Sequence, residues 1–189
     1  MAIIKARVIN IDSEKLDHVS LEMKKIGFDW ERVAGCTPTV EYSKKFAISY
    51  SHLFALYGVK GNLLICEDDV TFIDNARELF DEAFSQLPDD WDMFYLGGNV
   101  KRLARPYSKN LFRISYGVHC THAVLYTERA RDLILNSYDI YESYTKDYDH
   151  WLFCEGQGLM KCYICYPVIA YQGDDYYDDM KENELKHLI

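Results

Sequence analysis

The most constraining feature of this sequence is the alternation of short apolar runs with longer segments of helical periodicity. The run "IIKARVIN" predicts a strand, and residues 16–26 then carry apolar side chains at helical spacing until Gly27 ends the helix. The same succession of helix and strand continues through residues 46–66 and 76–98. Strands that alternate with helices indicate a largely parallel sheet covered on both faces, with ligands bound at the carboxyl ends of the strands.

Smaller signals place the remaining elements. Asp12 or Ser13 is expected to cap the first helix, and Asp74, Thr127 and Asp147 are expected to cap later ones. Further strands are predicted at the segments "FDWERVAG", "NLFRIS", "HAVLY", "MKCYICY" and "VIAYQ". The length of 189 residues matches one ordinary domain, so we expect the chain to fold as a single unit.

Charge and composition exclude some partners. The formal net charge of −9 opposes a phosphate backbone, so nucleic acid is not expected as a partner. The apolar run before Arg7 is too short for a signal peptide, and no later run reaches the length of an integral membrane segment. We therefore expect a soluble, cytoplasmic protein.

The six cysteines, without a secretory signal, indicate reduced thiols that mostly belong to the core. Cys162 and Cys165, together with Cys154 or His150, are candidate ligands of a zinc site. The surrounding segment alternates as a strand, however, and would point Cys162 and Cys165 to opposite faces. Buried thiols are the favoured interpretation.

The segment "GNLLICEDDVTF" places three acids at the end of a buried strand. In an extended backbone Glu67 and Asp69 point the same way, and carboxylates are hard ligands suited to Mg²⁺ or Mn²⁺. Asp68 would then face the other way and accept hydrogen bonds, for example from a ribose. The alternative is that these acids cap the following loop or keep the strand end solvated.

Several segments resemble one known family. They occur in order along most of the chain: "RVINIDSEKLDHV", "SHLFALYGVKGNLLICEDDVTF", "DMFYLGG", "THAVLYTERARDLI", "DYDHWLF" and "YPVIAYQ". Together they resemble glycosyltransferase family 25, which includes lipopolysaccharide and collagen galactosyltransferases. The sharpest parts are the strand end at Asn10, "SHL" at 51–53 and "EDDV" at 67–70. The resemblance implies an α/β fold of GT-A type (Rossmann-like), with a mixed, mostly parallel sheet flanked by helices on both faces.

The resemblance also implies an inverting hexosyltransferase. Its donor would be a nucleotide sugar, expected to be a UDP-sugar, its acceptor a hydroxyl of a glycan or glycoprotein, and its cofactor Mn²⁺ or Mg²⁺. Glu67 and Asp69 would hold the metal on the diphosphate. The residues expected to bind the donor are Ile9, Asn10, Ile11, Ser51, His52, Asp68, Gly97, Gly98 and Gln172.

The single domain, residues 1–189, would then divide by function. The nucleotide-binding half would span about residues 1–98, the acceptor-side half about 99–172, and an acidic tail 173–189. Gln172 could equally bind the acceptor or bridge backbone groups.

Three segments depart from the family pattern. His18 stands where the family usually has an arginine, which puts a phosphate or structural contact of that arginine in doubt. The residues "KKFAISY" precede "SHL" in place of the family's glycine-containing pattern, and "GDDYYDD" follows Gln172. The change after Gln172 bears on the acceptor side.

Inversion in a single displacement requires one base to take the proton of the acceptor hydroxyl. Asp149 is the candidate, because it stands near the start of a predicted helix and aligns with the family pattern. Asp147 is the rival, and plain helix capping is the alternative for both. His52, His119 and His122 would each suit a third metal ligand or a phosphate donor, and we assign none of them a catalytic role.

Two further functions compete with the metal-dependent glycosyltransferase. The first is a catalytically silent nucleotide-sugar or glycan-binding module of the same fold, which the missing arginine at position 18 leaves open. The second is a nucleotidyltransferase. We rank it last because the sequence shows no Gly-rich or basic phosphate loop.

Overall fold

A computed structural model describes residues 4–101 and 104–173. Its centre is an eight-stranded sheet in the order β2-β1-β3-β10-β5-β11-β8-β7, in which β10 and β8 run opposite to the other strands. The strands are β1 (Ile4–Asn10), β2 (Trp30–Ala34), β3 (Asn62–Glu67), β5 (Met93–Tyr95), β7 (Ala104–Ser108), β8 (Leu111–Ile114), β10 (Ala123–Tyr126) and β11 (Cys162–Cys165).

Two short two-stranded sheets lie beyond the carboxyl ends of central strands. β4 (Val70–Phe72), which follows β3, pairs with β12 (Ala170–Gln172). β6 (Asn99–Val100), which follows β5, pairs with β9 (Val118–His119). Because β10 is antiparallel to β3 and β5, the residues between β9 and β10 lie at this same edge.

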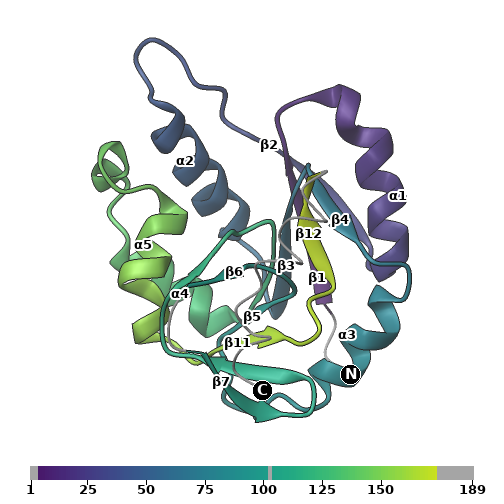
Figure 1. Cartoon of the computed structure of the whole chain (residues 1–189). Coiled ribbons are helices and arrows are strands. Elements are labelled where there is room, and N and C mark those ends of the chain that lie inside the picture. The colour runs from purple at the N-terminus through teal and green to yellow at the C-terminus, as the bar shows by residue number, and fades with distance from the viewer. Residues whose placement is uncertain (1–3, 102–103, 174–189) are drawn as a thin grey trace.

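Helices cover both faces of the sheet (Figure 1). α1 and α3 pack on one face, and α2, α4 and α5 pack on the other. Along β3, Leu63 and Ile65 join the core beneath α2, whereas Leu64 and Cys66 join the core beneath α1. The helices are α1 (Leu16–Ile26), α2 (Lys44–Leu56), α3 (Ala76–Phe84), α4 (Glu128–Ser137) and α5 (Tyr148–Cys154), with short 3₁₀ turns at Ser13–Lys15, Ile140–Tyr144 and Gly156–Leu159.

The predicted α/β class, with a mostly parallel sheet flanked on both faces, is confirmed. Its helix signals are also confirmed in detail. Asp12, Thr127 and Asp147 accept hydrogen bonds from backbone amides at helix starts, and Gly27 ends α1 with a φ of 71°. Cys162 and Cys165 belong to opposite cores, as the strand pattern predicted.

Other details differ from the prediction. The N-cap of α3 is Asn75 rather than Asp74, and it makes no side-chain capping bond. The short strands β4, β6, β7 and β9 were not predicted, because each exists only through pairing with a segment distant in sequence. The predicted acidic tail lies outside the described residues beyond Gly173. None of the described helices combines the length and apolarity needed to cross a bilayer.

Gly97 marks a close approach of two backbones at the edge where the site forms. A Cβ atom at this position would lie 1.8 Å from the carbonyl oxygen of Ala170 and 2.8 Å from Nε2 of His122. The amides of Ile169 and Ala170 donate to the Leu96 carbonyl at 2.8 and 3.1 Å. These hydrogen bonds hold the backbones together, so a side chain at position 97 has no space.

We expect Gly97→Ala to lower the free energy of unfolding by about 3 kcal/mol, because the added methyl group meets backbone that cannot rotate away. Urea denaturation measures this change. The matched control is Gly158→Ala, since a Cβ there meets no heavy atom within 4 Å. Equal stability of the two variants would contradict the close packing at Gly97.

Candidate functional site

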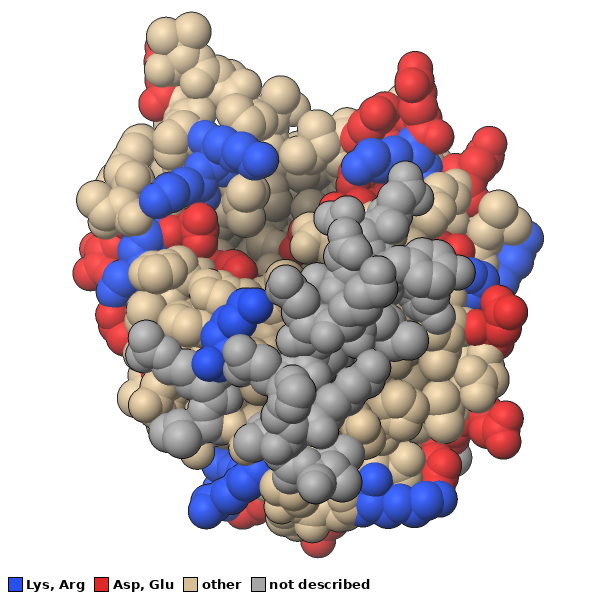
Figure 2. All heavy atoms as spheres, in the orientation of Figure 1, with Lys and Arg blue, Asp and Glu red and all other residues tan. Residues whose placement is uncertain are grey.

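A cleft opens at the carboxyl ends of β1 and β3. It spans about 370 Å³, including space open to solvent, between the end of β1, the inner face of α2 and the acids after β3. Figure 2 shows a hollow at the top of the molecule, between its α2 side and its α1 side. The cleft is lined by residues for which the sequence predicts donor or metal binding: Ile9, Ile11, Ser51, His52, Glu67 and Asp68. The structure brings these side chains together, and their roles stay predictions.

Ser51 fixes one wall of this cleft. Its hydroxyl donates to the Ala47 carbonyl at 2.7 Å and accepts the Cys36 amide at 2.8 Å. Ser51 therefore ties the segment after β2 to α2. The hydroxyl already makes two hydrogen bonds within the protein, so a nucleotide-sugar donor would have to share it with these two partners.

Asp68 anchors the end of β1. Its Oδ2 accepts Asn10 Nδ2 at 2.9 Å and the Ile11 amide at 3.1 Å, and its Oδ1 pairs with Lys15 Nζ at 3.0 Å. Asn10 is itself held, because its Oδ1 accepts Arg32 Nε at 2.8 Å. Asp68 therefore accepts hydrogen bonds, as predicted, but from three donors of the protein, and a contact with a ribose stays a prediction.

Glu67 ends β3 and turns toward α2. Its Oε1 accepts the Thr121 hydroxyl at 2.9 Å and lies 3.3 Å from His52 Nε2, while 26% of the side chain stays exposed. Burial raises the pKa of Glu67, but the hydrogen bond from His52, the electrostatic interactions with His52 and His122, and the hydrogen bond from Thr121 outweigh it. The net pKa lies below its ordinary value, which favours the carboxylate.

Asp69 faces a third set of partners. Residues 68 and 69 form a turn between β3 and β4, so the predicted extended geometry of the three acids is wrong. Gln172 Nε2 donates to Asp69 Oδ2 at 3.2 Å. Burial, followed by the negative charge of Glu67, raises the pKa of Asp69. The two predicted metal ligands are therefore electrostatically coupled although their side chains have different partners.

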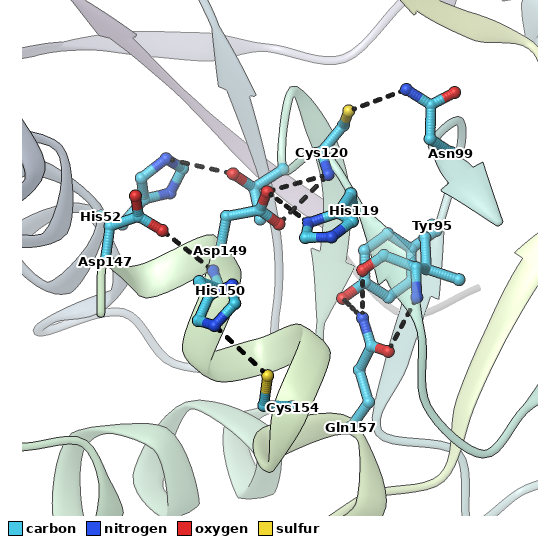
Figure 3. A network of polar contacts seen from close by, with 12 residues as sticks. His52, Tyr95, Asn99, His119, Cys120, Asp147, Asp149, His150, Cys154 and Gln157 are labelled. Carbon is cyan, nitrogen blue, oxygen red and sulfur yellow. Dashed lines mark hydrogen bonds and ion pairs between the residues drawn. The ribbon is translucent and has the colours of Figure 1, made fainter. Parts of the chain in front are cut away.

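A second pocket, of about 460 Å³, contains the predicted base. The Cys120 amide donates to both oxygens of Asp149, at 3.1 and 3.2 Å, and His119 Nδ1 lies 3.3 Å from Asp149 Oδ2 (Figure 3). Asp147 accepts the His150 amide at 3.0 Å as the N-cap of α5. The capping interpretation is thus confirmed for Asp147, while Asp149 presents its carboxylate to the pocket.

Residues 119–122 connect the two pockets. The Cys120 amide binds Asp149, the next residue, Thr121, binds Glu67, and the Glu67 amide donates to the His122 carbonyl at 3.0 Å. Cys120 has a φ of 78°, a left-handed conformation that residues with a side chain rarely adopt. Such backbone persists only where the surrounding contacts enforce it, and it concentrates at functional sites.

Helix α2 also connects the pockets through α5. The buried Ser49 hydroxyl accepts the Tyr148 amide and the Tyr138 hydroxyl, both at 2.9 Å. One turn further along α2, the His52 ring stacks on Tyr148 with ring centroids 4.8 Å apart. The helix that lines the first cleft is therefore bonded to the first turn of the helix that carries Asp149.

The remaining predicted residues occupy packed positions. Gly97 accommodates Ala170 and His122, and a Cβ at Gly98 would lie 2.8 Å from Val118 Cγ1. Gln172 supports Asp69. His18, at the position where the family resemblance would place arginine, contacts the Val70 carbonyl through Nε2 at 2.9 Å. Donor contacts of Gly97, Gly98 and Gln172 stay predictions.

Sequence reasoning missed Lys15 and Thr121. Lys15 belongs to a 3₁₀ turn after β1, and Asp68 comes close to it only because β3 pairs with β1 in the folded protein. Thr121 reaches Glu67 because β10 pairs with β3, a partner 54 residues away. Neither contact has a local sequence signal, although both residues lie in segments that resemble the family.

The residues near Asp69 offer acceptor atoms that suit a cation. Within residues 4–101 and 104–173, Asp69 Oδ1 and His122 Nδ1 are buried without a hydrogen-bond partner. Oxygen and imidazole nitrogen are ligands that Mn²⁺ accepts. No group of three or more His, Cys, Asp or Glu side chains in the described part of the chain is arranged to hold a metal by itself. A cation bound at these atoms would need substrate or water to complete its shell, because the described residues do not form a closed structural site.

Comparisons with known proteins agree with the fold. No family model and no curated protein matches the chain. The structure "S. aureus TarS 1-349" superposes with a TM-score of 0.54 at 14% identity, covering 98% of this chain and 65% of that one. A glycosyltransferase involved in glycosylation of the major capsid of PBCV-1 gives a TM-score of 0.42 at 10% identity, covering 98% and 99%. A putative glucose-1-phosphate thymidylyltransferase from Bacillus anthracis gives 0.48 at 10%, covering 96% and 75%. The chain has a GT-A type fold.

We expect Asp68→Ala to lower the free energy of unfolding by about 2 kcal/mol, because the buried Asn10 side chain loses one of its two acceptors and the Ile11 amide loses its side-chain acceptor. Lys15→Met is the control that removes only the partly exposed ion pair, and it should cost less than about 1 kcal/mol. Urea denaturation distinguishes the two. A larger loss for Lys15→Met would show that the ion pair, and not the anchor of β1, matters most.

Proposed function

We propose that this chain is an inverting, divalent-metal-dependent glycosyltransferase of the family 25 type. It would transfer a hexose from a nucleotide sugar, a UDP-sugar, to a hydroxyl of a glycan or glycoprotein. The observation that carries the proposal is the pair of adjoining pockets, one beside the acids after β3 and one around Asp149, bridged by residues 119–122. The first pocket would hold the donor and the second the acceptor, and acidic side chains line both.

The donor fits the cleft beside β1. Ile9 and Ile11 provide apolar walls for a nucleobase, and the end of β1 is kept rigid by Asp68. Lys15 stands at the same strand end with 46% of its side chain exposed. Its ammonium group can bind a diphosphate if it gives up its ion pair with Asp68. This ion pair is weak because Lys15 is exposed to solvent.

The metal would be held by Asp69 and Glu67, with Mn²⁺ or Mg²⁺ as the cation. Asp69 supplies the bare Oδ1, and the lowered pKa keeps Glu67 in the carboxylate form that ligation requires. When bound, a divalent cation neutralises the negative charge that develops on a departing diphosphate.

The chemical step is a single displacement at the anomeric carbon. The acceptor oxygen forms the new bond while the bond to the diphosphate breaks, and a base beside the acceptor takes the hydroxyl proton. The pocket of Asp149 provides that base, and a positioned base contributes about 10²- to 10⁴-fold to the rate. Inversion follows because attack and departure occur on opposite faces of the sugar.

We expect Mn²⁺-dependent turnover of one or more nucleotide sugars by the wild-type protein, and a loss of about 100-fold or more in Asp69→Asn. Release of the nucleoside diphosphate from a panel of donors measures it. Asp74→Asn is the matched control, because Asp74 is an exposed acid outside both pockets. Equal activity of Asp69→Asn and wild type would contradict the assignment of the metal ligands.

Mn²⁺ affinity should also depend on pH. A raised pKa means that the folded protein favours the protonated form of Asp69, so protons compete with the cation from a higher pH than at an ordinary aspartate. We expect affinity to fall steadily as the pH is lowered from about 7 to about 4. Calorimetric titration with Mn²⁺ alone measures it, and Asp69→Asn should flatten the dependence.

The competing function is a catalytically silent nucleotide-sugar or glycan-binding module. Two observations favour it: Asp68 already accepts hydrogen bonds from three donors of the protein, and the described residues hold no ready group of three metal ligands. Donor binding by calorimetry, together with no release of nucleoside diphosphate from any donor with Mn²⁺ and candidate acceptors, would establish that alternative.

A further inference from the structure

We propose that His119, oriented by Asp149, is the group that takes the proton from the acceptor hydroxyl. This inference rests on the proposed glycosyltransferase function and changes the role expected of Asp149. Asp149 becomes a positioning residue, and the imidazole of His119 becomes the catalytic residue of the second pocket.

The contacts of Asp149 argue against its acting as the base itself. One backbone amide, that of Cys120, donates to both carboxylate oxygens, and His119 lies against Oδ2. Because both of its oxygens are engaged by groups of the protein, the carboxylate has fewer lone pairs left for the hydrogen of an acceptor hydroxyl. A carboxylate held in this way is better suited to orient a partner than to remove a proton.

The geometry fixes the proton positions on His119. A carboxylate only accepts hydrogen bonds, so the nitrogen that faces Asp149, Nδ1, carries the ring hydrogen. The neutral ring then has its lone pair on Nε2, at the opposite edge, and no described residue hydrogen-bonds to that atom. His119 lines the pocket and is 33% exposed, so the basic nitrogen is accessible to an acceptor.

Packing holds the ring in this orientation. The His119 ring stacks on Phe153 with centroids 3.8 Å apart and an interplanar angle of 14°, and the centroid of the His150 ring lies 6.4 Å from that of His119. The charged and titratable groups that share the pocket are Lys45 from α2 and Asp147, Asp149 and His150 from α5. Of these, Asp149 is the one bonded to His119. A carboxylate, a histidine with one free nitrogen and an open pocket form the arrangement of an assisted general base.

The proposed step balances. The acceptor O–H transfers its proton to Nε2 of His119, its oxygen bonds to the anomeric carbon, and the electron pair of the breaking bond leaves with the diphosphate. The products are the glycoside, the nucleoside diphosphate and a protonated His119, whose positive charge faces Asp149. The imidazolium then returns its proton to solvent.

The test compares His119→Ala with Asp149→Ala in the presence of added imidazole. We expect each variant to lose about 10²- to 10⁴-fold in kcat with unchanged donor affinity. Free imidazole should restore His119→Ala by about tenfold or more, because it supplies the missing base in the vacated space, and should leave Asp149→Ala unrestored. Calorimetric donor titration confirms that both variants fold. The matched control is His150→Ala, whose residual activity should not respond to imidazole.

Two results would overturn the proposal. They are a kcat of His119→Ala within threefold of wild type, or a folded, donor-binding His119→Ala that imidazole fails to restore.

If wild type turns over no donor, the proposed function fails first, and ring nitrogen chemical shifts then test the pair of His119 and Asp149 independently. Long-range ¹H–¹⁵N spectra should show the hydrogen of His119 on Nδ1 in wild type and a shift of the tautomer in Asp149→Ala. A hydrogen on Nε2 of His119 in the wild-type protein would contradict the proposed orientation of His119 by Asp149.

Discussion

The hydrogen bonds of residues 120 and 121 are the constraint on which the site depends. The Cys120 amide reaches Asp149 and the Thr121 hydroxyl reaches Glu67, so adjacent residues of one short segment bind the acids of two pockets. This segment can neither lengthen nor rotate freely, because β9 and β10 hold its two ends. Cys120 adopts an unfavourable left-handed backbone conformation, and the two hydrogen bonds help to hold it there.

The sheet makes this arrangement possible. Its two faces are buried beneath separate sets of helices, which leaves the carboxyl edge as the place where polar groups gather without disturbing a core. The reversed strand β10 is decisive here. Because it runs against β3 and β5, its preceding residues arrive at the same edge as the acids that follow β3. A fully parallel sheet would deliver that segment to the opposite edge.

Local signals allowed much of the fold to be predicted from the sequence. A capping Asp12, a terminal Gly27 and the apolar spacing of α1 act within a few residues, so they can be interpreted without a partner. The residues expected to bind a donor were predicted by family resemblance, and the structure places most of them around one cleft. The geometry of the acids was mispredicted because β4 pairs with β12, about 100 residues away, and this pairing turns the chain at Asp68 and Asp69. The contacts of Thr121 and Asp149 likewise arise only from tertiary structure.

The bond between Ser49 and the first turn of α5 has a consequence for the order of events. Ser49 and His52 lie on one rigid helix, and both contact Tyr148, the neighbour of Asp149. Any displacement of α2 beside the first cleft must therefore move Tyr148 or break a buried hydrogen bond. The first cleft and the pocket around Asp149 are therefore mechanically linked. For the proposed transferase, this linkage would favour ordered over random addition of donor and acceptor.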